Sequence, residues 1–167
     1  MTKELWNILT KTTDSVRYSD SKAVSLLTVH GVIITVIYTN ATIVYTYVTS
    51  CWMTMFLGFL TAISILASVI ISFMVVSPYL VKNTTPSLMY FGDIQANFKN
   101  HQDYYQTLKA TFNDNDKIDE QLAQQIHITS IIAWRKFTFV GRSIQFFYVS
   151  LFLLLVNLVV CLSGVSL

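Results

Sequence analysis

The side chains best suited to chemistry in this sequence are basic ones that stand beside long apolar runs. They are Arg17, Lys22, Arg135, Lys136 and Arg142. Guanidinium and ammonium groups hold phosphate oxygens through charge-assisted hydrogen bonds. At the edge of an apolar run, however, such residues usually meet lipid headgroups. The residue types therefore predict phosphate binding and leave open whether the phosphate belongs to a lipid or to another ligand.

The residue patterns of catalysis and metal binding are absent from the sequence. It has no Gly-rich phosphate loop, no H-E-x-x-H or G-x-S-x-G motif, and only two cysteines. His101 beside Asp103 is more typical of a surface position. The acidic run from Asp114 to Asp119 lacks the central glycine and the closing glutamate of a calcium loop. We therefore expect no enzyme, no metal and no cofactor.

The charged residues are few and are confined to two blocks. Only 12% of the chain is charged and 53% is hydrophobic, whereas a soluble domain has about 25% charged residues. All eleven Lys and Arg and all nine Asp and Glu lie in Met1–Lys22 and Lys82–Arg142. The runs Ala23–Val81 and Ser143–Leu167 contain none. A bilayer core of about 30 Å needs about 20 apolar helical residues, so the sequence predicts a membrane protein.

The first apolar run has room for two spans and the second for one. The predicted spans are Ala23–Tyr47, Trp52–Val76 and Ile144–Gly164. Asn40 could end the first span several residues earlier. A turn is expected at Thr49–Cys51, and Pro78 should close the second span because proline disfavours helix at the preceding residue.

The distribution of basic residues predicts the topology. Both charged blocks should be cytoplasmic by the positive-inside rule, and three spans satisfy this with the N-terminus inside and the C-terminus outside. A secretory signal peptide is disfavoured because the leader would be long and acidic in part, with no A-x-A site. The predicted segments are a cytoplasmic N-terminal helix 1–22, a two-span hairpin 23–77, a cytoplasmic helical region 78–142 and a third transmembrane helix 143–167.

The cytoplasmic region between the second and third spans is predicted to be helical. Tyr105, Leu108 and Phe112 have helical spacing within Asp103–Phe112. A second amphipathic helix should begin at a cap on Asp116. Because no proline or glycine follows until Gly141, this helix is predicted to continue into the third span. The block has nearly balanced charge, so nucleic acid is not an expected partner.

Small or weakly polar residues form stripes along the predicted spans. They are Thr28, Gly31 and Thr35 in the first span, Gly58, Thr61 and Ser68 in the second, and Asn157 in the third. Such stripes let helices approach closely and hydrogen-bond to one another in a membrane. They predict helix packing either within one three-helix unit or between protomers of a homo-oligomer.

His30 is the one histidine in the first apolar run, which contains no Asp, Glu, Lys or Arg. A polar group at membrane depth is costly and raises the question of a function. We expect a neutral, hydrogen-bonded histidine that points away from the Thr28–Thr35 stripe, with a proton relay or pore lining as the alternative. Since no Asp, Glu, Lys or Arg lies in the spans, a coupled transporter is not expected.

Three short motifs resemble those of one known family. Asp20-Ser21-Lys22-Ala23 stands at the start of the first span, Tyr90-Phe91-Gly92-Asp93-Ile94 follows the second, and Ile131–Phe137 precedes the third. In order, spacing and topology the chain resembles the transmembrane Pycsar effector family along nearly its whole length.

The resemblance implies a role in bacterial antiphage defence at the inner membrane. A partner nucleotide cyclase would make a cyclic pyrimidine mononucleotide, cUMP or cCMP. The effector would sense this messenger and impair the lipid bilayer, which gives abortive infection. The alternative is a constitutively assembled channel or scaffold whose cytoplasmic helices bind a protein partner.

A cyclic nucleotide requires a cation for its phosphate and an aromatic surface for its base. The predicted ligand-binding residues are Arg17, Asp20, Lys22, Tyr90, Phe91, Asp93, Arg135 and Lys136. The cytoplasmic region is too small for a conventional cyclic-nucleotide β-roll and lacks its strand-and-glycine pattern. The pocket is therefore predicted to be helical, within one chain or shared between protomers, with lipid headgroups as the competing partner of the basic residues.

Overall fold

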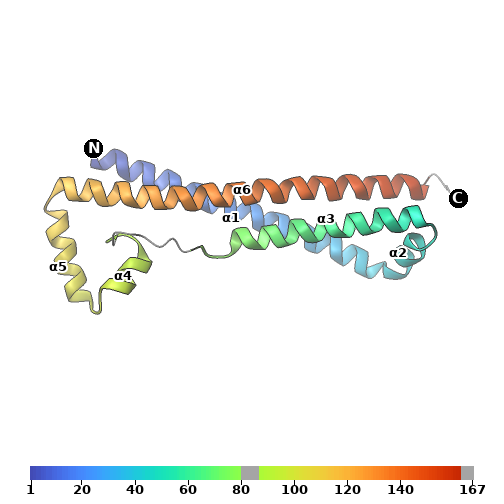
Figure 1. Ribbon diagram of the computed structural model, residues 1–167, viewed down its shortest axis with the longest axis horizontal. Helices are drawn as coiled ribbons and strands as arrows, with labels where there is room; N and C mark the ends of the chain where they lie inside the picture. The colour runs from blue at the N-terminus through green and yellow to red at the C-terminus, as the bar shows by residue number, and fades with distance from the viewer. Residues whose placement is uncertain (80–86, 163–167) are drawn as a thin grey trace. The chain divides into compact units, whose positions relative to one another are not determined.

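The computed structural model describes residues 1–79 and 87–162, and within them the chain forms helices and no strands. The six helices are α1 (Thr2–Thr39), α2 (Ala41–Val48), α3 (Trp52–Val76), α4 (Phe91–Asn97), α5 (His101–Phe112) and α6 (Asn115–Leu162), as Figure 1 shows. Helices α1, α3 and α6 are long and apolar enough to cross a membrane. The predicted all-α membrane protein with three spanning helices is confirmed, and its orientation stays a prediction.

The chain divides into two compact units. Unit 1 comprises Met1–Ser19 and Pro78–Phe137, and unit 2 comprises Asp20–Ser77 and Thr138–Leu167. Helices α1 and α6 contribute to both. Unit 1 contains the charged helices α4 and α5 and the first part of α6, whereas unit 2 contains the apolar lengths of α1, α3 and α6.

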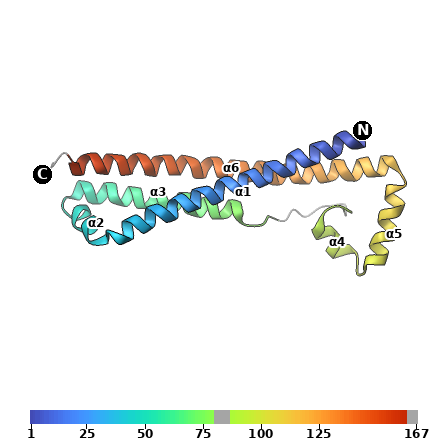
Figure 2. The same cartoon turned by 180° about the vertical axis from the view of Figure 1, so that it is seen from behind.

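Helix α1 ends at Thr39, and the predicted end of the first span at Tyr47 is wrong. Asn40 interrupts the helix, as the alternative had it, and its side-chain amide donates to the carbonyl of Val36 at 2.9 Å. Asparagine favours such local bonds over helix continuation. The short helix α2 follows and packs on α3 (Figure 2), where a Cβ at Gly58 would lie 3.3 Å from the side chain of Val48.

Helix α3 has the bounds that the sequence predicts. Its first turn is fixed by Thr54, whose hydroxyl donates to the carbonyl of Cys51 at 2.7 Å. At the other end Ser77 turns to an extended conformation with ψ of 134°. The cause is Pro78, which excludes the helical conformation from the residue before it.

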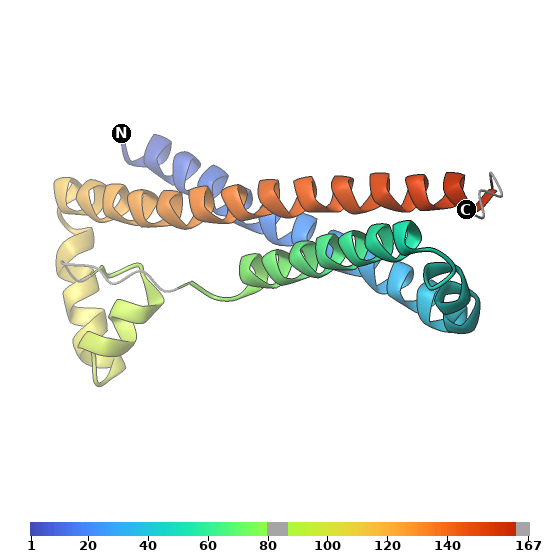
Figure 3. The ribbon, with the colours of Figure 1, turned by 45° about the vertical axis from the view of Figure 1, so that its right-hand side comes forward.

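Helices α5 and α6 begin at an asparagine cap and an aspartate cap, respectively. Asn100 accepts from the backbone N–H of Asp103 at 2.8 Å and starts α5 at His101. A tight corner then leads into α6 (Figure 3). Its cap is Asp114, which accepts from the N–H of Asp116 at 3.2 Å. The predicted cap at Asp116 is therefore wrong by two residues.

Helix α6 runs without interruption from Asn115 to Leu162. The predicted continuity between the last cytoplasmic helix and the third span is therefore confirmed. The predicted end of that span at Gly164 lies outside the described residues. In unit 2, α3 runs alongside the C-terminal part of α6 (Figures 1 and 2), with Ala23, Val75 and Val140 in a small apolar core.

Candidate functional site

Ser87 and Leu88, in the segment before α4, form hydrogen bonds with residues of α4, α5 and α6. The backbone N–H of Ser87 donates to the carboxylate of Asp93 at 2.9 Å. The N–H of Leu88 donates to Oε1 of Gln121 at 2.9 Å, and the hydroxyl of Tyr104 donates to the Leu88 carbonyl at 3.0 Å. Asp93, a predicted ligand-binding residue, is thus engaged in holding this segment.

At the start of α4, the side chain of Tyr90 is buried and that of the adjacent Phe91 is exposed to solvent. Tyr90 is 6% exposed, and its ring centroid lies 5.0 Å from that of Phe91, which is exposed. A Cβ at Gly92 would come within 2.9 Å of the Tyr90 ring, so glycine is needed for this close approach. Among the predicted ligand-binding residues, Tyr90, Phe91 and Asp93 are brought together here.

The predicted cations lie elsewhere. Arg17 faces Asp14 at 3.8 Å on an exposed turn of α1. The guanidinium carbon of Arg135 lies 3.7 Å from the centroid of the Tyr79 ring, a cation–π contact. Lys136 follows Arg135 on α6 and is half-buried.

Asp20 and Lys22 belong to unit 2 rather than to unit 1, on the length of α1 that follows Ser19. The eight predicted residues therefore do not form one cluster within either unit. Their assignment to ligand binding stays a prediction.

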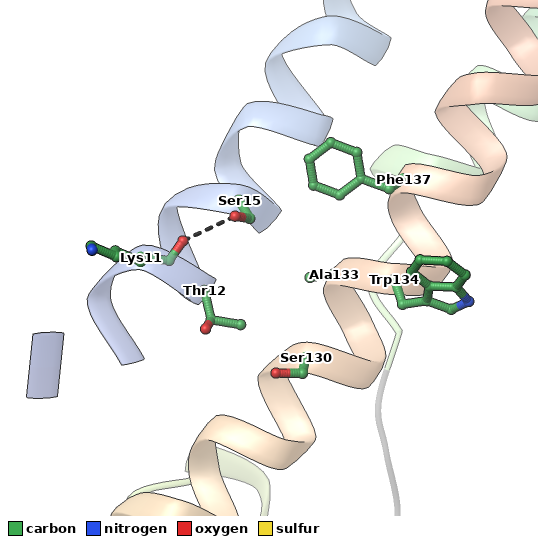
Figure 4. Close-up of a pocket in the computed structure, with 7 residues that line it drawn as sticks. All are labelled: Lys11, Thr12, Ser15, Ser130, Ala133, Trp134 and Phe137. Carbon is green, nitrogen blue, oxygen red and sulfur yellow. Dashed lines mark hydrogen bonds between the residues drawn. The ribbon is translucent and has the colours of Figure 1, made fainter. Parts of the chain in front are cut away.

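Unit 1 contains an open groove between its parts of α1 and α6, which we call the α1–α6 groove. Its volume is about 470 Å³. Figure 4 shows the lining residues, which are Lys11, Thr12, Ser15, Ser130, Ala133, Trp134 and Phe137. The ring of Phe137 is directed toward α1, whereas the ammonium of Lys11 and the indole of Trp134 lie at the two outer edges.

The hydroxyl groups of the groove are all satisfied by their own helices. Thr12 donates to Ile8 at 2.8 Å, Ser15 to Lys11 at 3.0 Å and Ser130 to Ile126 at 2.7 Å, in each case to a backbone carbonyl. A hydroxyl that donates its proton still has lone pairs with which to accept. The groove therefore has acceptors on both helices.

Sequence reasoning missed most of this groove. The motif Ile131–Phe137 includes Ala133, Trp134 and Phe137, but Lys11, Thr12, Ser15 and Ser130 are not among the predicted site residues. A signal was present, because Ser130, Ala133 and Phe137 are spaced three and four apart, as are neighbours on one helix face.

Unit 2 contains a closed contact made by serines, which we call the serine seam: Ser64, Ser68 and Ser72 on α3 and Ser143 on α6. Ser68 donates to the carbonyl of Ser143 at 2.9 Å, and Ser72 bonds the Ser143 hydroxyl at 2.6 Å. Ser64 donates to the carbonyl of Phe146 at 2.9 Å. Ser68, Ser72 and Ser143 are completely buried.

Asn157 extends the contacts between the same helices. Its side-chain amide donates to the carbonyl of Leu153 at 2.8 Å and to the hydroxyl of Thr61 at 3.3 Å. The hydroxyl of Tyr47 donates to the backbone carbonyl of Asn157 at 2.8 Å. Thr61 and Asn157 therefore join α3 to α6.

The stripe predicted on the first span has different surroundings. Thr28, Gly31 and Thr35 are exposed, and the two threonines donate to carbonyls of α1 itself. They make no packing surface within the described part of unit 2. Packing between protomers stays a prediction for this face.

His30 is 1% exposed, with its ring centroid 5.3 Å from that of Phe147 in an edge-on contact. Its Nδ1 lies 2.7 Å from the carbonyl of Leu26. Because a carbonyl only accepts, Nδ1 is assigned the proton. Nε2 is buried without a hydrogen-bond partner among the described residues. The ring serves α1–α6 packing.

The described residues contain no group of three His, Cys, Asp or Glu side chains that could hold a metal ion. Asp114, from the acidic run, instead caps α6. The backbone N–H of Lys117 donates to its carboxylate and holds the pKa of Asp114 below the ordinary value.

Comparison with known proteins identifies one family. A family model described as the Pycsar effector protein domain matches residues 4–163. No curated protein and no solved structure matches the chain.

Proposed function

Because the chain belongs to the Pycsar effector family, we propose that it senses a cyclic pyrimidine mononucleotide and in response impairs the inner membrane of its bacterium. Family membership makes the protein an effector of antiphage defence. The messenger would be cUMP or cCMP, made by a partner nucleotide cyclase. The membrane damage would end the infected cell before phage spreads.

One observation carries this proposal: the family domain spans both units of the chain. It covers residues 4–163, which include the charged helices of unit 1 and all three helices of spanning length. A sensor and a membrane effector are therefore proposed to reside in one domain. The basic side chains of unit 1 favour a phosphate-bearing signal.

Within the bilayer, the proposed output is a rearrangement of helices in a homo-oligomer. The serine seam is a polar contact between α3 and the part of α6 that follows Arg142, and neither of these lengths contains Lys, Arg, Asp or Glu. Interhelical hydrogen bonds of this kind contribute only about 0.6 kcal/mol each in a membrane. A seam of such bonds can open at moderate cost when ligand binding favours another arrangement.

The test is release of a self-quenched dye from liposomes that contain the purified protein. Nucleotide is added to both faces of the bilayer, so that the result does not depend on orientation. We expect release with cUMP or cCMP and none with cAMP, cGMP or linear UMP. Protein-free liposomes with each nucleotide are the control.

Two other outcomes have definite meanings. Release without any nucleotide would favour the constitutively assembled channel. No release with any nucleotide, from protein that retains its helical circular dichroism, would contradict the proposal. We also propose that the chain is not an enzyme, in which case chromatography recovers the messenger unchanged after the assay.

A further inference from the structure

The α1–α6 groove is an open, mostly apolar groove with hydroxyl groups on both of its helices. We propose that it is where the messenger binds, with the ligand a cyclic pyrimidine mononucleotide held between α1 and α6 of unit 1. This inference rests on the proposed function, because that function supplies the class of ligand. It adds the location, which the predicted ligand residues do not provide.

The size and charge of the groove suit such a ligand. Its volume of about 470 Å³ lies within the range of about 300–1,000 Å³ that small-molecule sites occupy. Its base is kept open by small side chains, among them Ala133, which is 8% exposed. None of the seven lining residues is acidic, so the lining itself does not repel a phosphate.

The hydrogen-bonding capacity of the groove matches a nucleoside. The hydroxyls of Thr12, Ser15 and Ser130 donate to backbone carbonyls of their own helices, so toward a ligand their oxygens can only accept hydrogen bonds. A ligand must therefore bring donors, and the ribose hydroxyl and the N–H groups of a pyrimidine base are such donors. The ring of Phe137, 39% exposed and directed toward α1, offers a surface on which a base can stack.

Lys11 and Trp134 lie at the two edges of the groove, where their side chains could contact a bound ligand. In Figure 4 the ammonium of Lys11 and the indole of Trp134 point away from the middle. The four-carbon stem of lysine is flexible, so the ammonium can turn toward a bound phosphate. Trp134, at the other edge, is 78% exposed, so its indole is accessible to a molecule bound in the groove.

Trp134 also supplies the assay. The chain has three tryptophans, and Trp6→Phe with Trp52→Phe leaves Trp134 as the single fluorophore. The full-length protein in detergent is titrated with cUMP and cCMP. We expect saturable quenching of Trp134 and protection of its fluorescence from acrylamide.

Filling the groove is the decisive variant. Ser130→Leu places a branched side chain among the lining residues, and Ala123→Leu makes a similar addition at an exposed position of the same helix outside the groove. We expect Ser130→Leu to weaken binding about tenfold or more, which corresponds to about 1.4 kcal/mol. Ala123→Leu should leave the affinity unchanged.

A second variant tests the phosphate contact. Lys11→Ala should weaken binding of the cyclic nucleotide severalfold and leave weak binding of the uncharged nucleoside unchanged. Lys109→Ala removes the same charge from α5 and is the matched control. Equal loss in both lysine variants would overturn the specific role of Lys11.

The outcomes separate the two proposals. A wild type that binds no cyclic nucleotide contradicts the proposed function and this inference with it. Undiminished binding by Ser130→Leu overturns the inference alone. Protection of Trp134 in phosphatidylglycerol nanodiscs, but not by nucleotide, would assign the groove to a lipid headgroup and overturn the inference as well.

Discussion

The serine seam and the α1–α6 groove both contain small hydroxyl residues on two facing helices, but these hydroxyls bond to the facing helix only in the seam. In the seam, the hydroxyls of Ser64 and Ser68 donate to carbonyls of the neighbouring helix at 2.9 Å. In the groove, the hydroxyls of Thr12, Ser15 and Ser130 donate to their own helices. The seam is buried and closed, whereas the groove is open.

The difference teaches that small hydroxyl residues permit close packing but do not dictate it. A serine hydroxyl can reach the carbonyl four residues earlier wherever no better acceptor is near. In the seam, Ser143 faces Ser68 and Ser72 and bonds both of them, whereas the three hydroxyls of the groove donate to carbonyls of their own helices. The surroundings of each stripe therefore determine whether it becomes a contact or a cavity.

The largest expected effect is on the seam, at Ser143. Ser143→Leu would force a large side chain into a completely buried position and remove the bonds to Ser68 and Ser72. Overpacking of this kind costs about 3 kcal/mol. Unfolding in mixed micelles should show this loss, whereas Ser25→Leu, at an exposed position, should not. Equal stability of the two variants would contradict the conclusion that the seam is a closely packed contact.

The next largest effect is expected in unit 1, on the stability of the segment that contains Ser87 and Leu88. Asp93→Ala would leave the buried N–H of Ser87 without its carboxylate, which costs about 1–3 kcal/mol. Hydrogen exchange at the Ser87 amide should become faster. Asp93→Asn retains an acceptor oxygen and should recover most of the protection. If both variants bind nucleotide as wild type does, Asp93 positions its segment and does not bind the ligand.

A smaller effect is expected at the bond between Asn157 and Thr61. Thr61→Val removes the hydroxyl and retains the shape, so the loss should be about 0.6 kcal/mol, as for other polar pairs in membranes. Unfolding in mixed micelles measures it, with Thr35→Val on the exposed face of α1 as the control. A loss as large as that of Ser143→Leu would show that the Asn157–Thr61 bond stabilises the contact between α3 and α6 as strongly as the serine seam does.

The smallest effect concerns acid and the start of α6. Hydrogen bonds from the backbone lower the pKa of Asp114 from 3.8, so its contribution is present above that pH and is lost as the pH falls below it. The protection of the Asp116 and Lys117 amides, measured as exchange relative to the intrinsic rate at each pH, should therefore fall in acid. In Asp114→Ala the same amides should exchange rapidly at every pH, and persistence of the pH dependence would contradict the assignment.

The sequence predicts the helices better than their contacts. The bounds of α3 could be read from Trp52 and Pro78, because an apolar run and a proline act locally. The sequence predicts the cap of α6 at Asp116, whereas the structure has it at Asp114. Two aspartates two residues apart are equally suitable caps by residue type. The first-span stripe at Thr28 and Gly31 looked like the seam stripe at Thr61 and Ser68, yet only the latter meets another helix within unit 2.

The candidate groove was less predictable for a related reason. Trp134 lies within the motif Ile131–Phe137, beside the predicted ligand residues Arg135 and Lys136. Thr12 and Ser130 are far apart in sequence, and nothing in their types shows that α1 and α6 leave a space between them. Cavities depend on how far two backbones are separated, which the pattern along one helix does not record.

The break at Asn40 has a consequence for the bilayer itself. The apolar part of α1 from Ala23 to Thr39 is only about 25 Å long at the helical rise of 1.5 Å per residue, and the 25 residues of α3 extend about 37 Å. A hydrocarbon core of about 30 Å cannot match both lengths at once. In such a bilayer, the short apolar part of α1 favours local thinning or snorkelling of its flanking residues, whereas the longer α3 favours tilting.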